Sequence, residues 1–247
     1  MIKRNIKLCL RYDGTNYHGW QKQSNTKVTV AGSLEKAIQT VTGESVRIIA
    51  ASRIDAGAHA YGQVVNFQTN AKWDSSVFSK AISCNLPPDI VVYDARDMPS
   101  NFDARFSARW RRYQYLILNS PHPSPFYRNY AYFQPHQLDI DRMLEGAKWI
   151  VGKHDFSSFC TRSKTIENHI RTVHLLLIEK KGDFISMDII ANAFLYGMIR
   201  SIAGILIDVG KGKKSPEDVK KVLEAKDRKM GPAVRPACGL YLVEVGY

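Results

Sequence analysis

The amino-acid sequence predicts an α+β fold: two βαββα-like halves that form a mainly antiparallel, mixed sheet with helices packed on one side. Strand-like alternation and helix-like spacing follow one another in a comparable order in each half of the chain, with Gly and Pro between the segments. A chain of 247 residues is long enough to bury a substantial core, in one large domain or two smaller ones. We expect the two halves to span residues 1–105 and 106–247.

Each element of the first half is predicted from its own pattern. Apolar residues at every second position predict strands, and apolar residues three or four apart, closed by Gly or Pro, predict helices. The predicted elements are a strand at 6–12, a helix through 34–41 stopped by Gly43, strands at 45–50 and 63–67, a helix at 76–86 ended by Pro87-Pro88, and a strand at 90–93.

The second half repeats this plan. Its last helix has the clearest start signal, with Ser215 as the N-cap and Pro216 in the first turn. The predicted elements are a long strand at 109–118, a loop at 120–135, a helix at 138–150, strands at 170–179 and 184–190, a buried helix at 194–209, the helix that begins at Ser215, and a final strand at 240–245.

The charge balance indicates a nucleic-acid partner. There are 35 Lys and Arg against 23 Asp and Glu, a net charge of +12, and the sequence pI is about 9.5. Arginines alternate with aromatic residues from Arg109 to Tyr115, a combination that suits a splayed nucleotide. Such contacts would weaken with salt, although each short basic run is also compatible with a solvated surface. Alternation places Tyr113 and Tyr115 on one face of a strand, where core packing is equally expected.

Several protein classes are disfavoured. The longest apolar stretch, 193–209, is interrupted by Arg200 and Asp208, so we expect no membrane span, and no signal-peptide pattern follows Met1. The four cysteines (Cys9, Cys84, Cys160 and Cys238) have no paired spacing, so we expect neither a zinc site nor a disulfide framework. A cytoplasmic, reducing setting without metal or cofactor fits this pattern.

The stretch from Arg53 to His59, Arg-Ile-Asp-Ala-Gly-Ala-His, is the candidate catalytic segment. It places Asp55 two residues from a guanidinium in the connection between two predicted strands, and connections often carry chemistry. Local physics leaves a second interpretation open, because Asp followed by Gly is common in simple turns and a nearby Arg is often a solvated partner.

Six motifs, in order, resemble those of the tRNA pseudouridine synthase A family, over almost the whole chain. The resemblance implies that Asp55 is the catalytic residue and that Tyr113 contacts the target base. It also implies a central RNA-binding cleft and a homodimer that modifies the tRNA anticodon arm at positions 38–40 without a cofactor. The motifs are the segments 11–22, 53–57, 112–115, 154–159, 194–200 and 237–242.

The implied reaction breaks the N1–C1′ bond of uridine and forms a C5–C1′ bond. Asp55 would act as a nucleophile or as a base that removes a sugar proton, and either role needs an ionised carboxylate. Arg53 and Arg200 are the candidates to hold it charged, and Arg200 needs a partner because it lies in an apolar helix. The base must be flipped out of the folded RNA. Further candidate RNA-binding residues are Arg109, Arg111, Arg112 and His59.

Three positions depart from the family pattern: Ser52 stands where the family has Gly, Ile54 where it has Thr, and Ala31 where a Gln is common. A diverged paralogue acting on another RNA, or an RNA-binding protein or chaperone without catalysis, therefore stays open. A hydrolase is disfavoured because no Gly-x-Ser-x-Gly elbow occurs, and a metal-dependent nuclease because the motif offers one carboxylate.

Overall fold

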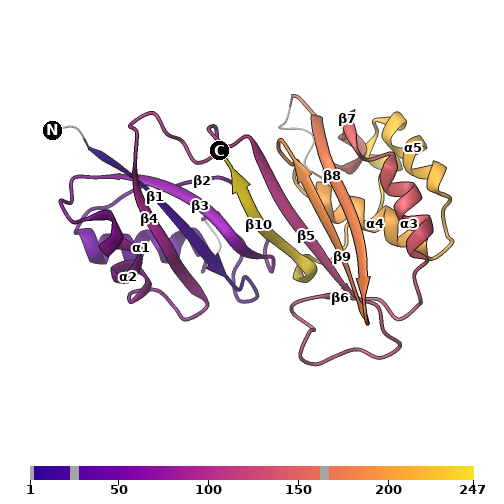
Figure 1. Ribbon diagram of the computed structural model, residues 1–247, viewed down its shortest axis with the longest axis horizontal. Helices are drawn as coiled ribbons and strands as arrows, with labels where there is room; N and C mark the ends of the chain where they lie inside the picture. Colours follow the sequence, from indigo (N-terminus) through magenta and orange to yellow (C-terminus); the bar gives the residue numbers. More distant parts are fainter. Residues whose placement is uncertain (1–2, 23–27, 162–166) are drawn as a thin grey trace. The chain divides into compact units, whose positions relative to one another are not determined.

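The computed structural model describes residues 3–22, 28–161 and 167–247, and the chain divides into two compact units (Figure 1). Unit 1 comprises Met1–Arg109 together with Tyr241–Tyr247, and unit 2 comprises Trp110–Leu240. Each unit combines helices with a mostly antiparallel sheet and carries its helices on one side of that sheet, so the predicted fold class is confirmed.

Unit 1 contains a sheet in the order β4-β1-β3-β10, and β2 adds to β3. β1 is central and antiparallel to both neighbours, with Leu8 opposite Val65 on β3 and Ala95 on β4. β10 runs parallel to β3, with Tyr241 opposite His59. The elements are β1 (Arg4–Tyr12), α1 (Val30–Thr42), β2 (Ile49–Ala50), β3 (His59–Thr69), α2 (Ser75–Ser83), β4 (Ile90–Met98) and β10 (Leu240–Gly246).

The core of unit 1 lies between this sheet and its two helices. Ile6, Leu8 and Leu10 alternate along β1 and are fully buried. Phe78 of α2 contacts Phe67 of β3 edge-on, with ring centroids 6.1 Å apart. α1 ends at Gly43, which has φ +73°, as the sequence predicts for a helix C-terminus.

Unit 2 repeats the arrangement with the strand order β5-β9-β8-β7, all antiparallel, and β6 pairs with β5 in parallel. α3 packs against α4, α5 and β8. The elements are β5 (Trp110–Leu118), β6 (Tyr132–Phe133), α3 (Ile140–Lys148), β7 (Gly152–Asp155), η1 (Ser157–Phe159), β8 (Ile170–Lys181), β9 (Phe184–Ala191), α4 (Met198–Gly210), α5 (Pro216–Ala225), η3 (Arg228–Met230) and η4 (Ala237–Gly239).

α4 is the buried helix of unit 2. Ile205, Leu206 and Ile207 are consecutive residues that point in different directions around the helix, and all three are fully buried, so α4 is surrounded on several sides. α3 approaches it closely at Gly146, where a Cβ would lie 3.3 Å from the Leu206 side chain. No helix in the described part of the chain is long and apolar enough to cross a membrane.

Some predicted boundaries were wrong, for identifiable reasons. The strand expected at 45–50 is only Ile49–Ala50, because only these two residues pair with β3. The helix expected from residue 194 begins at Met198, since Gly197 has φ +75° and precedes the first helical turn. β7 was not predicted at all.

Arg4, at the start of β1, connects three parts of unit 1. Its guanidinium makes a bidentate ion pair with Asp97 on β4, at 2.9 and 2.8 Å, and Nη1 donates to the carbonyl oxygens of Ala71 and Trp73 before α2, at 2.8 and 2.6 Å. The hydrogen bond from Arg4 holds the pKa of Asp97 below its ordinary value.

Arg4→Met should lower the free energy of unfolding by about 1–3 kcal/mol, because two carbonyls and a carboxylate lose their donor. Asp97→Asn should cost less at neutral pH. Its cost should vanish as the pH falls through the lowered pKa of Asp97, since the ion pair stabilises the fold only while the carboxylate is ionised. Urea unfolding at several pH values measures both. Arg96→Met removes an exposed guanidinium from β4 and is the control, and an equal loss in Arg96→Met and Arg4→Met would contradict the prediction.

Candidate active site

The loop between β2 and β3 carries the predicted catalytic residue. Asp55 is half-buried and Arg53, two residues earlier, is exposed. The Ala58 amide donates to the Asp55 carbonyl at 3.2 Å, and Gly57 has φ +76°, so the chain reverses directly after Asp55. Arg53, Asp55 and His59 thus lie in one short stretch that leads into β3.

A second segment of unit 1, the turn at residues 13–20, packs its backbone against this loop. The Trp20 amide donates to the Ile54 carbonyl at 3.0 Å. A Cβ at Gly14 would lie 1.8 Å from the Ala58 carbonyl oxygen, and one at Gly19 would lie 3.0 Å from the Ile54 carbonyl oxygen. Two glycines therefore allow a backbone-to-backbone contact that no larger residue permits.

His59, the first residue of β3, ties the same turn to the sheet. Its ring is 2% exposed, and Nδ1 lies 3.1 Å from both the Gly14 amide and the Asp13 carboxylate. Nδ1 accepts from the amide in one tautomer and donates to the carboxylate in the other. The imidazole also stacks on Tyr241, with centroids 4.8 Å apart. His59 is thus built into the support of the Asp55 loop.

The turn is also anchored to the start of β4. The Tyr17 hydroxyl donates to Asp89 at 2.5 Å, and the Asp13 amide donates to the Asp89 carbonyl at 3.0 Å. Burial, together with the hydrogen bond to Asp89, raises the pKa of Tyr17. Tyr17 is therefore a neutral donor at physiological pH.

The three departures from the family pattern fall on residues with structural roles. The Ile54 side chain is 6% exposed and belongs to the core. The Ser52 carbonyl accepts from the side-chain amide of Gln63 at 2.8 Å. Ala31 is also buried, and its amide donates to the Trp20 carbonyl at 3.1 Å. The backbone contacts at all three positions are available to other residue types.

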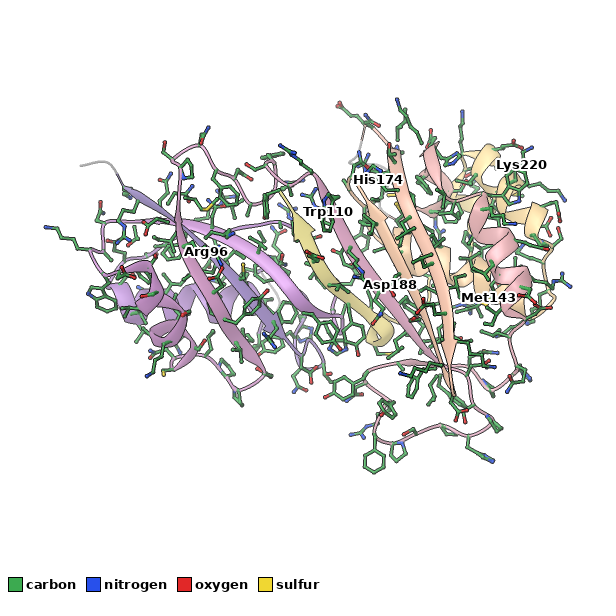
Figure 2. The ribbon with its side chains drawn as sticks, in the orientation of Figure 1. Arg96, Trp110, Met143, His174, Asp188 and Lys220 are labelled. Carbon is green, nitrogen blue, oxygen red and sulfur yellow. The ribbon has the colours of Figure 1, made fainter. Side chains whose placement is uncertain are left out.

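In unit 2, the predicted site residues on β5 alternate between the two faces of the strand. Arg111, Tyr113 and Tyr115 lie on the buried face, with 7%, 4% and 0% exposure. The guanidinium of Arg111 donates to the Asn192 carbonyl at 2.9 Å. Arg112, on the other face, forms an ion pair at 2.7 Å with Asp188. Asp188 lies on β9 and is labelled in Figure 2. Arg109, in unit 1 just before β5, is exposed.

Tyr113 and Arg200 are held by separate contacts within unit 2. The Tyr113 ring meets Phe194 edge-on, with centroids 5.1 Å apart. Arg200, half-buried in the first turn of α4, donates from Nε to the Arg235 carbonyl at 2.6 Å, and the Arg235 amide donates back to the Arg200 carbonyl at 3.2 Å. Arg235 in turn forms an ion pair with Asp208 at 2.6 Å.

Residues that the sequence did not single out complete this picture. Gly14 and Gly19 lie in a motif that carried the family resemblance, yet no local pattern indicated what they contact. No sequence pattern indicated that Arg235 would contact Arg200. Across the described residues, no group of three or more His, Cys, Asp or Glu side chains is arranged to hold a metal ion.

Comparison with known proteins gives a consistent result. A family model described as tRNA pseudouridine synthase matches residues 8–107 and 147–247. The tRNA pseudouridine synthase A of Thermoanaerobacter sp. (strain X514) is 46% identical over 244 residues, covering 99% of this chain and all of the relative. The tRNA pseudouridine synthase A 2 of Clostridium tetani (strain Massachusetts / E88) is 40% identical over 247 residues, covering both chains completely. A chain in a crystal structure of a Cbf5–Nop10–Gar1 complex aligns weakly, with a TM-score of 0.37, 11% identity, and coverage of 81% of this chain and 54% of that one.

Gly14→Ala should disrupt the Asp55 loop, because the added Cβ would overlap the Ala58 carbonyl. We expect a loss of about 1–3 kcal/mol in unfolding free energy and faster hydrogen exchange at the Trp20 and Ala58 amides, which fix the loop. Gly43→Ala is the control, since its Cβ meets open space and only the positive φ is strained. Exchange at Trp20 and Ala58 that is unchanged in Gly14→Ala would show that the two segments do not depend on this contact.

Proposed function

The chain belongs to the tRNA pseudouridine synthase family, and we propose that it isomerises uridine to pseudouridine at positions 38–40 of the tRNA anticodon arm, with Asp55 as the catalytic residue. The observation that carries the assignment of Asp55 is its loop, which holds the family's catalytic motif and is fixed by backbone contacts with the turn at 13–20.

The reaction is an isomerisation, so it needs no external donor or acceptor of electrons or of a chemical group. The N1–C1′ bond breaks, the base turns, C5 bonds to C1′, C5 loses its proton and N1 gains one. Asp55 takes part either by attacking the substrate or by removing a sugar proton. Both roles require a carboxylate that the substrate can reach, and a half-buried side chain on a fixed loop meets this need.

We propose roles for the other site residues from the family resemblance and from their charge. The exposed Arg53 would hold the flipped nucleotide beside Asp55. Arg200 would supply the counter-charge to the carboxylate, and Tyr113 would contact the turned base. Arg109 and Arg112 would contact phosphates, whereas Arg111, which is buried and donates to Asn192, would support β5.

The family resemblance extends the proposal to the oligomeric state and the cellular location of the enzyme. We propose that two copies act as a homodimer on one tRNA and that they do so in the cytoplasm. The net charge of +12 supports binding of a polyanion of this size.

Asp55→Asn should abolish pseudouridine formation and leave tRNA affinity within several-fold, because the carboxylate takes part in chemistry and adds little to phosphate binding. Carbodiimide-adduct mapping of the tRNA gives the product and its position, and gel shifts on the same preparation give the affinity.

Asp97→Asn removes a carboxylate from β4 and serves as the matched control, with activity expected to stay near that of the wild type. Near wild-type turnover by Asp55→Asn would disprove the catalytic assignment. Binding by the wild-type protein without any product would indicate an RNA-binding protein instead.

Arg200→Met should move the acid limb of the pH-rate profile to higher pH, because loss of a nearby positive charge raises the pKa of a carboxylate that must be ionised. Arg235→Met disturbs the same region by removing the ion pair with Asp208 and keeps the charge of Arg200, so it should lower the melting temperature without moving that limb. Profiles and melting curves are measured for each variant. An Arg200→Met profile identical to that of the wild type would exclude Arg200 as the counter-charge of Asp55.

A further inference from the structure

Three aromatic rings stack in a row in unit 1, directly after the Asp55 loop. His59 and Tyr241 have centroids 4.8 Å apart, and Tyr241 and Tyr61 lie 5.1 Å apart with ring planes only 7° from parallel. The row runs from the interior to the surface, since His59 and Tyr241 are 2% and 5% exposed and Tyr61 is 56% exposed. Its inner end is fixed by the contacts of His59 with the turn at 13–20.

A cation, Arg11, lies on the strand next to the exposed end of this row. The pairing of β1 with β3 shifts between Leu10 and Tyr12, which oppose Gln63 and Ala60, so Arg11 faces the two residues Tyr61 and Gly62 at a β-bulge. Because Leu10 and Tyr12 are buried, alternation directs Arg11 to the opposite, uncovered face of the sheet.

The Arg11 guanidinium lies 4.7 Å from the ring centroid of Tyr93 on the next strand, β4, and Tyr93 is 45% exposed. Tyr61, Arg11 and Tyr93 therefore follow one another across three adjacent strands, β3, β1 and β4. Exposed rings next to a cation are the combination that holds unpaired nucleotides, because bases stack on the rings and the cation attracts the phosphates.

We propose that Tyr61 is a stacking platform for an unpaired base that neighbours the target uridine, and that Arg11 contacts the backbone of the same strand. This inference rests on the proposed function and adds a substrate-contacting residue to it. Tyr61 follows Asp55 by six residues and lies near the start of β3, the strand into which the catalytic loop leads, so both belong to one continuous segment of unit 1.

The stack explains why Tyr61 suits this role. An exposed side chain normally loses rotamer freedom when a ligand binds, and that loss weakens binding. Tyr61 has its inner face against Tyr241, so the ring is already ordered and the base meets a preformed surface. A flipped uridine leaves its neighbours without a stacking partner, and an aromatic ring replaces that partner.

The test is a double-mutant cycle with an anticodon stem-loop RNA and RNAs that carry an abasic nucleotide on either side of the target. Tyr61→Ala should lower kcat/KM on the intact RNA by about tenfold. On the RNA whose abasic site removes the stacked base, wild type and Tyr61→Ala should be equally active, because the contact is already absent. Tyr61→Phe should retain activity, since the ring face is kept.

Two matched controls test whether removing any exposed aromatic ring or any exposed cation has the same effect. Trp73→Ala removes a ring that is 46% exposed beyond the far end of β3, and it should leave kcat/KM within twofold. Arg11→Gln should reduce the log-log salt slope of binding by about one, and Lys36→Gln, an exposed cation on α1, should leave that slope unchanged.

Several outcomes would overturn the proposal. Full kcat/KM in Tyr61→Ala would contradict it. An equal loss on the intact RNA and on both abasic RNAs would also contradict it, because that result marks a structural role. If Tyr61→Ala fails to fold, Tyr61→Leu decides, because it keeps an apolar contact with Tyr241 without a ring face. Product formation by the wild-type protein is scored separately, so failure of the platform and failure of the proposed function are distinguishable.

Discussion

The candidate site depends on one close contact, that between the backbone of the turn at 13–20 and the backbone of the Asp55 loop. Gly14 and Gly19 permit it, and the hydrogen bond from Trp20 to Ile54 fixes its register. The Asp55 carboxylate can face a substrate in one orientation only if another part of the chain holds the backbone of its loop, and unit 1 supplies that support from the turn that directly follows β1.

The structure also divides the chain's positive charge into two functional groups. Arg4 and Arg235 are engaged with carboxylates, and Arg111 is buried against a carbonyl, so these guanidinium groups stabilise the fold. Others, such as Arg11, Arg53 and Arg109, are exposed. The total of 35 Lys and Arg therefore overstates the number of cations available to a polyanion, whereas the net charge of +12 already accounts for the paired ones.

Periodicity was sufficient to predict the fold class and most elements, because each amphipathic segment buries the face that its sequence indicates. It also placed Tyr113 and Tyr115 on one face of β5, although it did not show that Arg111 is buried beside them. The support of Asp55 could not be predicted in this way, since Gly14 and Ala58 are far apart in sequence and only tertiary structure brings them together. The sequence did not predict a role for Tyr61 either, because tyrosine is common in strands whether its ring lies in the core or at the surface.

Unit 1 is discontinuous, because residues 110–240 are synthesised between its main segment and β10. During translation, the start of β3 lacks its β10 partner at His59 and Ala60 until the whole of unit 2 has been synthesised, and an unpaired edge can form wrong strand pairs. Unit 2 is contiguous and has no such delay. The stack of His59 on Tyr241 joins residues from the two ends of this interval, so the order in which the chain leaves the ribosome makes it one of the last contacts to form.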